Sequence, residues 1–211
     1  MKPPLPGQEP RPTRSFAYRA GDPLWTIAQG RPIEFSGDEK FYFFGRNCGA
    51  GEAMTVVADL APARLADSLP IARLPKSGTA GWALGVTANG DVFLRVGSRE
   101  RHADAVARGV LQVGRTTQVA ATFFQGEICL FVNGELKART KTPFARLDDT
   151  GTPGRMGANS GRYEAVGDVT LSTNGPTNAQ NWGSYAGRLG GVSIYNRSLS
   201  AAEVAALNPR R

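Results

Sequence analysis

Residues 118–140 decide the fold, and they read QVAATFFQGEICLFVNGELKART. Apolar residues alternate with polar or smaller ones on both sides of Gln125-Gly126, a period of two that is typical of half-buried strands. Asn133-Gly134 follows the second run. This dipeptide tolerates positive φ at both central positions of a type I′ turn, which closes a two-residue hairpin. The stretch therefore predicts three antiparallel strands joined by tight turns.

Short apolar runs bounded by Gly, Asn or Asp continue through the chain, and Asn89-Gly90 predicts another two-residue hairpin. The predicted strands are 33–35, 41–44, 54–60, 81–87, 91–96, 118–124, 127–132, 135–140, 166–172 and 187–195. One helix is predicted after a capping box at residues 200–203, SAAE. Because strands do not alternate with helices, we predict an all-β domain of two packed antiparallel sheets. Trp82 is assigned to its core.

The composition fits one domain of this class. The chain has 211 residues, with 26 glycines and 14 prolines that favour turns over long helices. Residues 1–30 are predicted to form an extended, proline-rich N-terminal arm, because the first 15 residues hold five prolines and few apolar side chains. The folded domain is predicted over residues 31–207, and a basic tail over 208–211.

Several segments resemble a known family: residues 119–122, 128–135 and 192–203, with 33–38 and 82–86 fitting its earlier strands. They look like the laminin G-like members of the concanavalin A-like lectin and glucanase superfamily. The resemblance implies a two-sheet antiparallel jelly-roll sandwich with one short C-terminal helix. It leaves the function open, because such domains include sugar-binding modules, adhesion domains, glycanases, lyases and surface domains of viral particles.

One departure from the family pattern concerns metal binding. Gly190-Gly191 stand where relatives often carry Asp-Glu, a pair that offers a carboxylate oxygen to calcium in some of them. We therefore expect no cofactor. Calcium remains an alternative through the turn residues Asp38, Asp148 and Asp149, although Asp also favours turns for its own local hydrogen bonds.

A polar loop with two aromatic residues, 174–185, is the candidate ligand site. Aromatic ring faces stack on sugars, and amides bond their hydroxyls. The predicted ligand-binding residues are Asn178, Gln180, Asn181, Trp182 and Tyr185. The alternative is structural, with turn-forming residues above and both rings tucked beneath the loop.

Catalytic patterns are missing from the sequence. Glycanases of this fold place carboxylates at spacings of two on one strand, and no predicted strand carries that array. The single histidine, His102, lies in RERHAD, which has no apolar period and is predicted to be an exposed loop. We predict a protein that is not an enzyme, with a glycan-degrading enzyme as an alternative.

The net charge and the cysteines limit which partners are expected. The net charge of +7 is spread over arm, loops and tail without interleaved aromatics, so no specific nucleic-acid partner is predicted. No stretch reads as a signal peptide or membrane span, so we expect no membrane partner. An extracellular surface or a virion is favoured over the free cytosol. Cys48 and Cys129 are interpreted as two buried thiols, with one long-range disulfide as the alternative.

The leading hypothesis is a lectin-like recognition or adhesion module that binds carbohydrate or another surface ligand. The second is a structural role, as a surface or decoration component of a larger assembly such as a phage particle, or as a homo-oligomer. In that case Phe16, Tyr18 and Trp25 of the arm would grip neighbouring subunits. Docking of the arm on its own chain is equally open.

Overall fold

The computed structural model describes residues 25–27, 32–37, 42–44, 51–73, 81–98, 101–148, 154–156 and 184–208. Its strands are β1 (Trp25–Ile27), β2 (Ile33–Ser36), β3 (Tyr42–Phe44), β4 (Ala53–Pro62), β5 (Ser68–Arg73), β6 (Gly81–Val86), β7 (Val92–Ser98), β8 (Arg101–Ala107), β9 (Thr117–Phe124), β10 (Glu127–Val132), β11 (Glu135–Lys141), β12 (Gly154–Met156) and β13 (Ala186–Tyr195). One helix, α1 (Ala201–Ala206), follows them. None of the described helical segments is long and apolar enough to cross a membrane.

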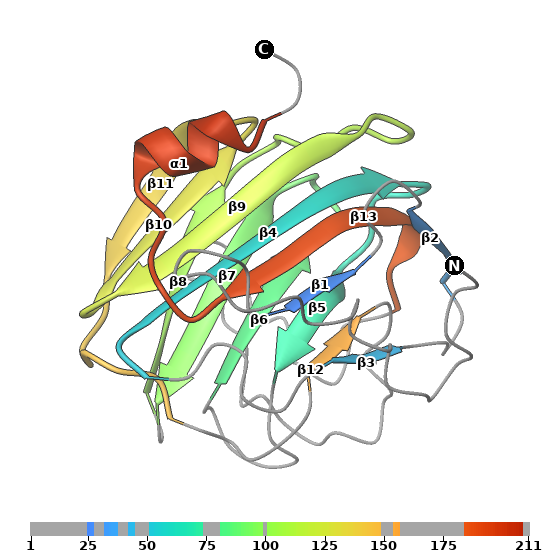
Figure 1. The fold of residues 1–211 in the computed structure, drawn as a ribbon. Helices are drawn as coiled ribbons and strands as arrows, with labels where there is room; N and C mark the ends of the chain where they lie inside the picture. Colours follow the sequence, from blue (N-terminus) through green and yellow to red (C-terminus); the bar gives the residue numbers. More distant parts are fainter. Residues whose placement is uncertain are drawn as a thin grey trace.

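The described strands form two antiparallel sheets that pack face to face, as predicted (Figure 1). The first, sheet A, has the order β1-β13-β4-β9-β10-β11, and β2 also pairs with β13. The second, sheet B, has the order β3-β12-β5-β6-β7-β8. The fold is therefore the expected all-β jelly-roll sandwich with one short C-terminal helix.

The core lies between the two sheets and follows the alternation of the strands. On β4, Met54, Val56, Ala58 and Leu60 are fully buried against sheet B, while the residues between them face outward. Trp82 on β6 is also fully buried in this core, as predicted. Burial of each large apolar side chain contributes roughly 1.5–3 kcal/mol to folding.

The tight turns confirm part of the hairpin prediction. Gln125 and Gly126 have φ of 43° and 85°, and Asn133 and Gly134 have 51° and 83°, so both central residues of each turn have positive φ, as a type I′ turn requires. At Asn89-Gly90 only the glycine has positive φ, so the predicted two-residue turn is wrong there.

Thr87 explains the longer loop at that position. Its Oγ1 accepts hydrogen bonds from the backbone N–H groups of Asn89 (3.3 Å) and Asp91 (3.1 Å). Its own N–H donates to the Asp91 carbonyl (3.1 Å). A side chain that bonds the backbone in this way stabilises an alternative to the two-residue turn.

Four strands were not predicted: β1, β5, β8 and β12. The prediction that His102 lies in an exposed loop is wrong, because it lies on β8, where it pairs with Gly97 of β7. The reason is a cross-strand ion pair: Asp104 stands opposite Arg95, and the two side chains form a bidentate contact (Nε–Oδ1 2.7 Å, Nη2–Oδ2 2.5 Å). These charges satisfy each other without an apolar period. The predicted strand 166–172 lies outside the described residues.

The predicted helix is confirmed together with its capping box. The Glu203 N–H donates to Ser200 Oγ, and the Ser200 N–H donates to the Glu203 carboxylate. The helix lies on the outer face of sheet A, at the upper left in Figure 1. The contact between the helix and sheet A forms a second apolar cluster, made of Val57, Ala120, Phe131, Tyr195, Leu199 and Val204.

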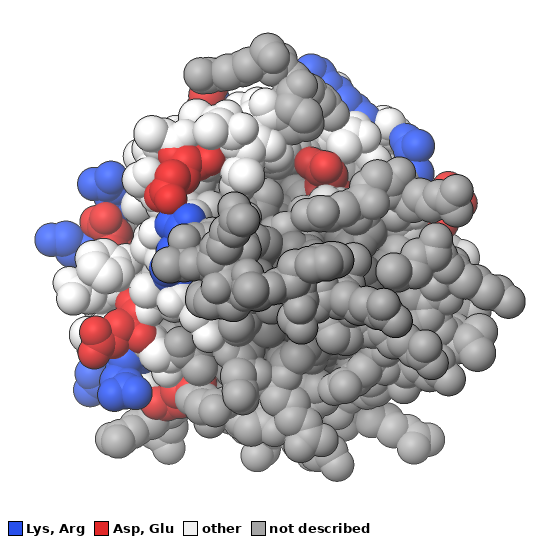
Figure 2. Space-filling view, viewed as in Figure 1, with Lys and Arg blue, Asp and Glu red and all other residues white. Residues whose placement is uncertain are grey.

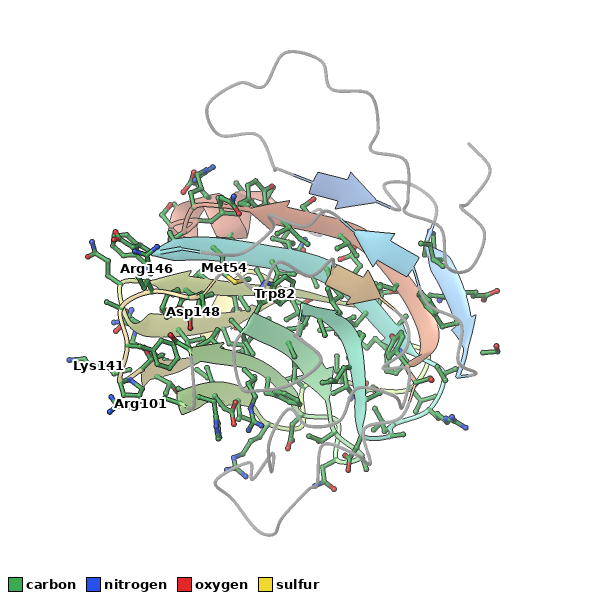
Figure 3. The ribbon with its side chains drawn as sticks, turned by 90° about the horizontal axis from the view of Figure 1, so that it is seen from below. Met54, Trp82, Arg101, Lys141, Arg146 and Asp148 are labelled. Atoms are coloured by element: carbon green, nitrogen blue, oxygen red, sulfur yellow. The ribbon has the colours of Figure 1, made fainter. Side chains whose placement is uncertain are left out.

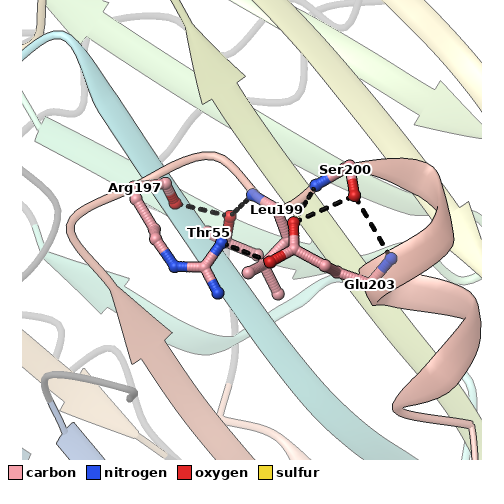
Figure 4. A network of polar contacts seen from close by, with 5 residues as sticks. All are labelled: Thr55, Arg197, Leu199, Ser200 and Glu203. Atoms are coloured by element: carbon pink, nitrogen blue, oxygen red, sulfur yellow. Dashed lines mark hydrogen bonds and ion pairs between the residues drawn. The ribbon is translucent and has the colours of Figure 1, made fainter. Parts of the chain in front are cut away.

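Thr55 of β4 connects this helix to the sheet (Figure 4). Its hydroxyl donates to the Arg197 carbonyl (2.8 Å) and accepts from the Leu199 N–H (2.9 Å). Thr55 is fully buried, so both backbone groups depend on this one side chain.

Candidate functional site

The predicted ligand loop is described only at its end. Asn178, Gln180, Asn181 and Trp182 lie outside the described residues. Tyr185 is described, and it is 1% exposed.

Tyr185 belongs to the core. Its ring meets Phe35 edge-on, with centroids 6.4 Å apart, and its hydroxyl donates to the Arg188 carbonyl (3.2 Å). Burial raises its pKa, so the phenol stays protonated and remains a donor. This placement contradicts a contact between the Tyr185 ring and a ligand, because a ring covered by protein cannot stack on a sugar. It agrees with the alternative that this ring has a structural role.

A pocket of about 260 Å³ opens on the outer face of sheet A. Its lining residues come from four separate segments of the chain: Pro32, Asp59, Ala61, Thr116, Arg188, Gly190 and Gly191. The Tyr185 hydroxyl donates to the backbone carbonyl of one of them, Arg188. The buried phenol therefore contacts the backbone of this pocket at Arg188. We call the pocket the bulge pocket.

An irregularity in β13 shapes the bulge pocket. The register between β13 and β4 shifts between Gly190 and Ser193, and Gly191 has a φ of 55°. A Cβ at residue 191 would lie 2.8 Å from Oδ2 of Asp59, closer than side chains tolerate. Glycine at this position therefore permits both the backbone conformation and the position of the Asp59 carboxylate.

Asp59 was not predicted as a site residue. It is the only charged residue in β4, a strand whose other residues are apolar except for Thr55, and this is the signal that could have identified it. Its neighbours Ala58 and Leu60 point into the core, so Asp59 faces outward. The departure from the family at Gly190-Gly191 thus places a carboxylate from β4 beside the two glycines of β13.

The bulge pocket combines polar and apolar groups. The Asp59 carboxylate accepts hydrogen bonds, the exposed Arg188 guanidinium donates them, and the Thr116 hydroxyl does both. Pro32 and Ala61 add apolar surface. Its volume lies just below the range of about 300–1,000 Å³ of pockets for drug-sized ligands, so it suits a small hydroxyl-bearing ring.

Comparison with known families now adds to this geometry. A family model described as the concanavalin A-like lectin/glucanases superfamily matches residues 36–205. The chain belongs to this superfamily. No curated protein matches the chain.

Solved structures of the superfamily fold resemble the domain. The carbohydrate-binding module CBM40 of the Ruminococcus gnavus IT-sialidase, bound to α2,3-sialyllactose, has a TM-score of 0.60 and 17% identity, covering 88% of this chain and 99% of that one. Domains LG4-5 of the mouse laminin α1 chain have a TM-score of 0.58 and 13% identity, covering 85% and 44%. The botulinum neurotoxin serotype G binding domain has a TM-score of 0.60 and 10% identity, covering 89% and 45%. At these identities the likeness shows the fold.

A second polar group, the pair of Arg95 and Asp104, lies on the outer face of sheet B. Arg95 is 2% exposed, and its Nη1 is buried without a hydrogen-bond partner. Burial lowers the pKa of the neighbouring His102, and Arg95 lowers it further, against the opposing effect of Asp104. The Asp104 carboxylate neutralises most of the charge of the Arg95 guanidinium within the sheet. The Arg95–Asp104 pair therefore explains the pairing of β7 with β8 more directly than it explains ligand binding.

The calcium alternative depended on three turn residues. Asp148 accepts a hydrogen bond from Ser98 Oγ (2.9 Å), which joins it to the end of β7. Asp38 and Asp149 lie outside the described residues. Within the described ranges, no three His, Cys, Asp or Glu side chains gather in a group that could hold a metal ion.

The remaining predicted residues concern the cysteines and the arm. Cys129 is a half-buried free thiol on the outer face of sheet A, and burial raises its pKa. Cys48, Phe16 and Tyr18 lie outside the described residues. Trp25 lies in β1, which pairs with β13 of its own chain. For this segment, docking on its own chain is therefore the observed alternative.

Proposed function

We propose that the protein is a lectin-like carbohydrate-binding module that performs no catalysis, and that its ligand occupies the bulge pocket. The observation that carries the proposal is the convergence of Asp59, Arg188 and Thr116 on a pocket the size of a small ring. The shared fold supports it, since CBM40 is a carbohydrate-binding module and was solved with a bound sialylated sugar.

The chemistry of the pocket suits a sugar. The Asp59 carboxylate would accept hydrogen bonds from adjacent hydroxyls, while the Arg188 guanidinium would donate to ring or hydroxyl oxygens. Pro32 and Ala61 would contact the apolar C–H face of the ring. A few polar groups with a small apolar surface are typical of ligand sites.

The loop before β13 belongs to the proposed site. The Tyr185 hydroxyl is bonded to the backbone of Arg188, which lines the bulge pocket, and Trp182 precedes Tyr185 by three residues, which an extended chain spans in about 10 Å. We propose that Trp182 lies at the rim and stacks on the sugar. Asn178, Gln180 and Asn181 would then bond its hydroxyls.

The test is a glycan-array screen followed by calorimetry on the sugar that binds. Arg188→Ala and Trp182→Ala are each expected to weaken binding about tenfold, the loss of roughly one charge-assisted hydrogen bond or one stacked ring. Lys137→Ala is the matched control, because it removes an exposed cation on β11. Failure of the parent to bind any glycan, or equal affinity of pocket variants and parent, would refute the proposal.

The ligand class also suggests a location. We propose that the module acts at an extracellular surface, where glycans are displayed. Residues Trp25–Ile27 do not support the alternative of assembly through the arm, because they pair with β13 of their own chain.

A further inference from the structure

The end of the sandwich near the Gln125-Gly126 turn carries three exposed cations from separate segments: Arg101 at the start of β8, Lys141 at the end of β11, and Arg146 in the segment that follows β11. Figure 3 shows all three projecting outward at the same end of the molecule. None has a carboxylate within 4.0 Å among the described residues. Some other cations of the described chain do, since Lys137 contacts Glu135 and Arg197 contacts Glu203.

The backbone fixes the spacing of these cations. The Thr142 N–H donates to the Gly126 carbonyl (2.7 Å), and Leu147 exchanges two backbone hydrogen bonds with Gly51 (2.7 and 2.9 Å). Arg146 lies between these attachment points. Asp148, two residues after Arg146, accepts a hydrogen bond from Ser98, and Ser98 pairs with Arg101. Arg101 is therefore connected to the segment that carries Arg146.

An exposed aromatic ring shares a sheet face with one of them, Lys141. Phe124 is 50% exposed, and it is the one aromatic residue among the exposed large hydrophobic residues of the described chain. Phe124, Glu127 and Lys141 stand in register on β9, β10 and β11, so their side chains share one face of sheet A. Two strand spacings separate the ring from Lys141, about 10 Å, a span comparable to a disaccharide.

Acidic side chains limit which polyanions fit. Glu127 lies between Phe124 and Lys141 and contacts Arg139 (3.7 Å), and Glu52 is exposed on the segment bonded to Gln125. Figure 2 likewise shows acidic and basic side chains interspersed along the left margin of the molecule. A polymer with closely spaced phosphates or sulfates would place some of its negative charges next to these carboxylates, which repel them. A polymer with well-separated negative charges can place each charge beside a cation.

We propose that this end of the sandwich, formed by Phe124, Lys141, Arg146 and Arg101, binds an acidic polysaccharide whose carboxylates are separated by neutral sugar units. Phe124 stacks on a sugar ring, and the three cations contact successive carboxylates along the chain. This surface is separate from the bulge pocket and does not depend on a ligand there.

The experiment measures calorimetric binding of short hyaluronan oligomers, which carry a carboxylate on every second ring, by the full chain. The same oligomers with methyl-esterified carboxylates are the matched probe without charge. The parent is expected to bind the acidic form at least tenfold more tightly, and added salt is expected to weaken it. Exposed ion pairs contribute little individually, about threefold each, so the Arg101→Ala/Lys141→Ala/Arg146→Ala triple variant should lose about 30-fold.

Three further variants separate the contributions. Phe124→Ala should weaken both forms of the oligomer equally, by roughly fivefold, because stacking does not depend on charge. Arg108→Ala removes an exposed arginine just beyond the other end of β8 and should leave binding unchanged. Arg188→Ala in the bulge pocket should also leave it unchanged, which separates this surface from the proposed function.

Several results would overturn the proposal. They are no binding of hyaluronan by the parent, equal binding of the acidic and esterified forms, or full binding by the triple variant with an unchanged thermal unfolding temperature. Equal or tighter binding of a short DNA duplex would instead identify a surface for closely spaced phosphates.

Discussion

The outer face of sheet A has two halves that share β4 and β13 but are built differently. In one half α1 covers the sheet, and Val57 and Tyr195 are buried beneath it. In the other half, the same two strands present Asp59 and Arg188 at the bulge pocket. Only a few residues along each strand separate a closed apolar contact from an open polar site.

The last segment that carries the family resemblance lies in the covered half. The segment 192–203 forms the end of β13, the approach to α1 and its cap, and Thr55 joins that segment to the sheet. Asn133 accepts from Asn208 Nδ2 (2.7 Å), so the hairpin turn contacts the end of the helix as well. The segment 192–203 therefore builds the covered half, while Asp59, Arg188 and Thr116 of the open half lie outside the segments that carry the resemblance.

The largest expected effect lies in the covered half. Phe131→Ala removes a ring that is 4% exposed beneath α1, and we expect a loss of about 3–5 kcal/mol in the free energy of unfolding. Chemical denaturation measures it. Arg188→Ala, in the open half, is the control and should change stability by less than about 0.5 kcal/mol. Equal losses in both variants would contradict the division into a structural and a binding half.

Thr55→Val tests the connection between helix and sheet. Valine preserves the volume but leaves the Arg197 carbonyl and the Leu199 N–H without their shared partner. We expect a loss of about 1–3 kcal/mol in unfolding free energy, the cost of unsatisfied buried groups. Faster hydrogen exchange at the α1 amides should accompany it. Unchanged exchange would mean that the apolar contact alone holds the helix.

Gly191→Ala tests the open half. Alanine at a φ of 55° costs about 1–2 kcal/mol, and its Cβ would displace the Asp59 carboxylate. We therefore expect a modest loss of stability with a loss of sugar affinity. Gly109→Ala serves as the control, because it also has positive φ but has no neighbour within 4 Å of the added Cβ. A normal affinity in Gly191→Ala would exclude Asp59 from the site.

The smallest effect concerns the cap of α1. Hydrogen bonds from the Ser200 backbone and then from the Arg197 side chain lower the pKa of Glu203 below its usual value of 4.5. The stabilisation is therefore fully present above that value and is lost as pH falls through the lowered pKa. Glu203→Gln should reduce unfolding free energy by less than 1 kcal/mol near neutral pH, and the difference should shrink in acid. A difference that grows as pH falls would contradict this assignment of the cap.

Local chemistry explains which elements could be predicted. Asn133-Gly134 and the capping box at Ser200 are determined by a few adjacent residues, and both were identified correctly. Strand β8 was missed because its pairing depends on the Arg95–Asp104 contact rather than on an apolar period. Strand β1 was missed because three residues pair with a partner far along the chain.

The candidate site was harder to predict for the same reason. The bulge pocket gathers residues from near β2, from β4, from the segment before β9 and from β13, and no local pattern links them. Tyr185 looked like a ligand contact because aromatic residues among amides are typical of sugar sites. Its burial depends on packing against Phe35, which lies 150 positions earlier in the numbering of the chain.

Strand β1 also has a consequence for self-association. Unpaired strand edges invite pairing with a second molecule, and sheet A protects its two edges by different means. At one edge, β1 and β2 together occupy the backbone groups of β13. At the other, β11 places Lys137, Arg139 and Lys141 at alternate positions. Three residues, Trp25–Ile27, thus keep part of β13 from acting as a template for aggregation.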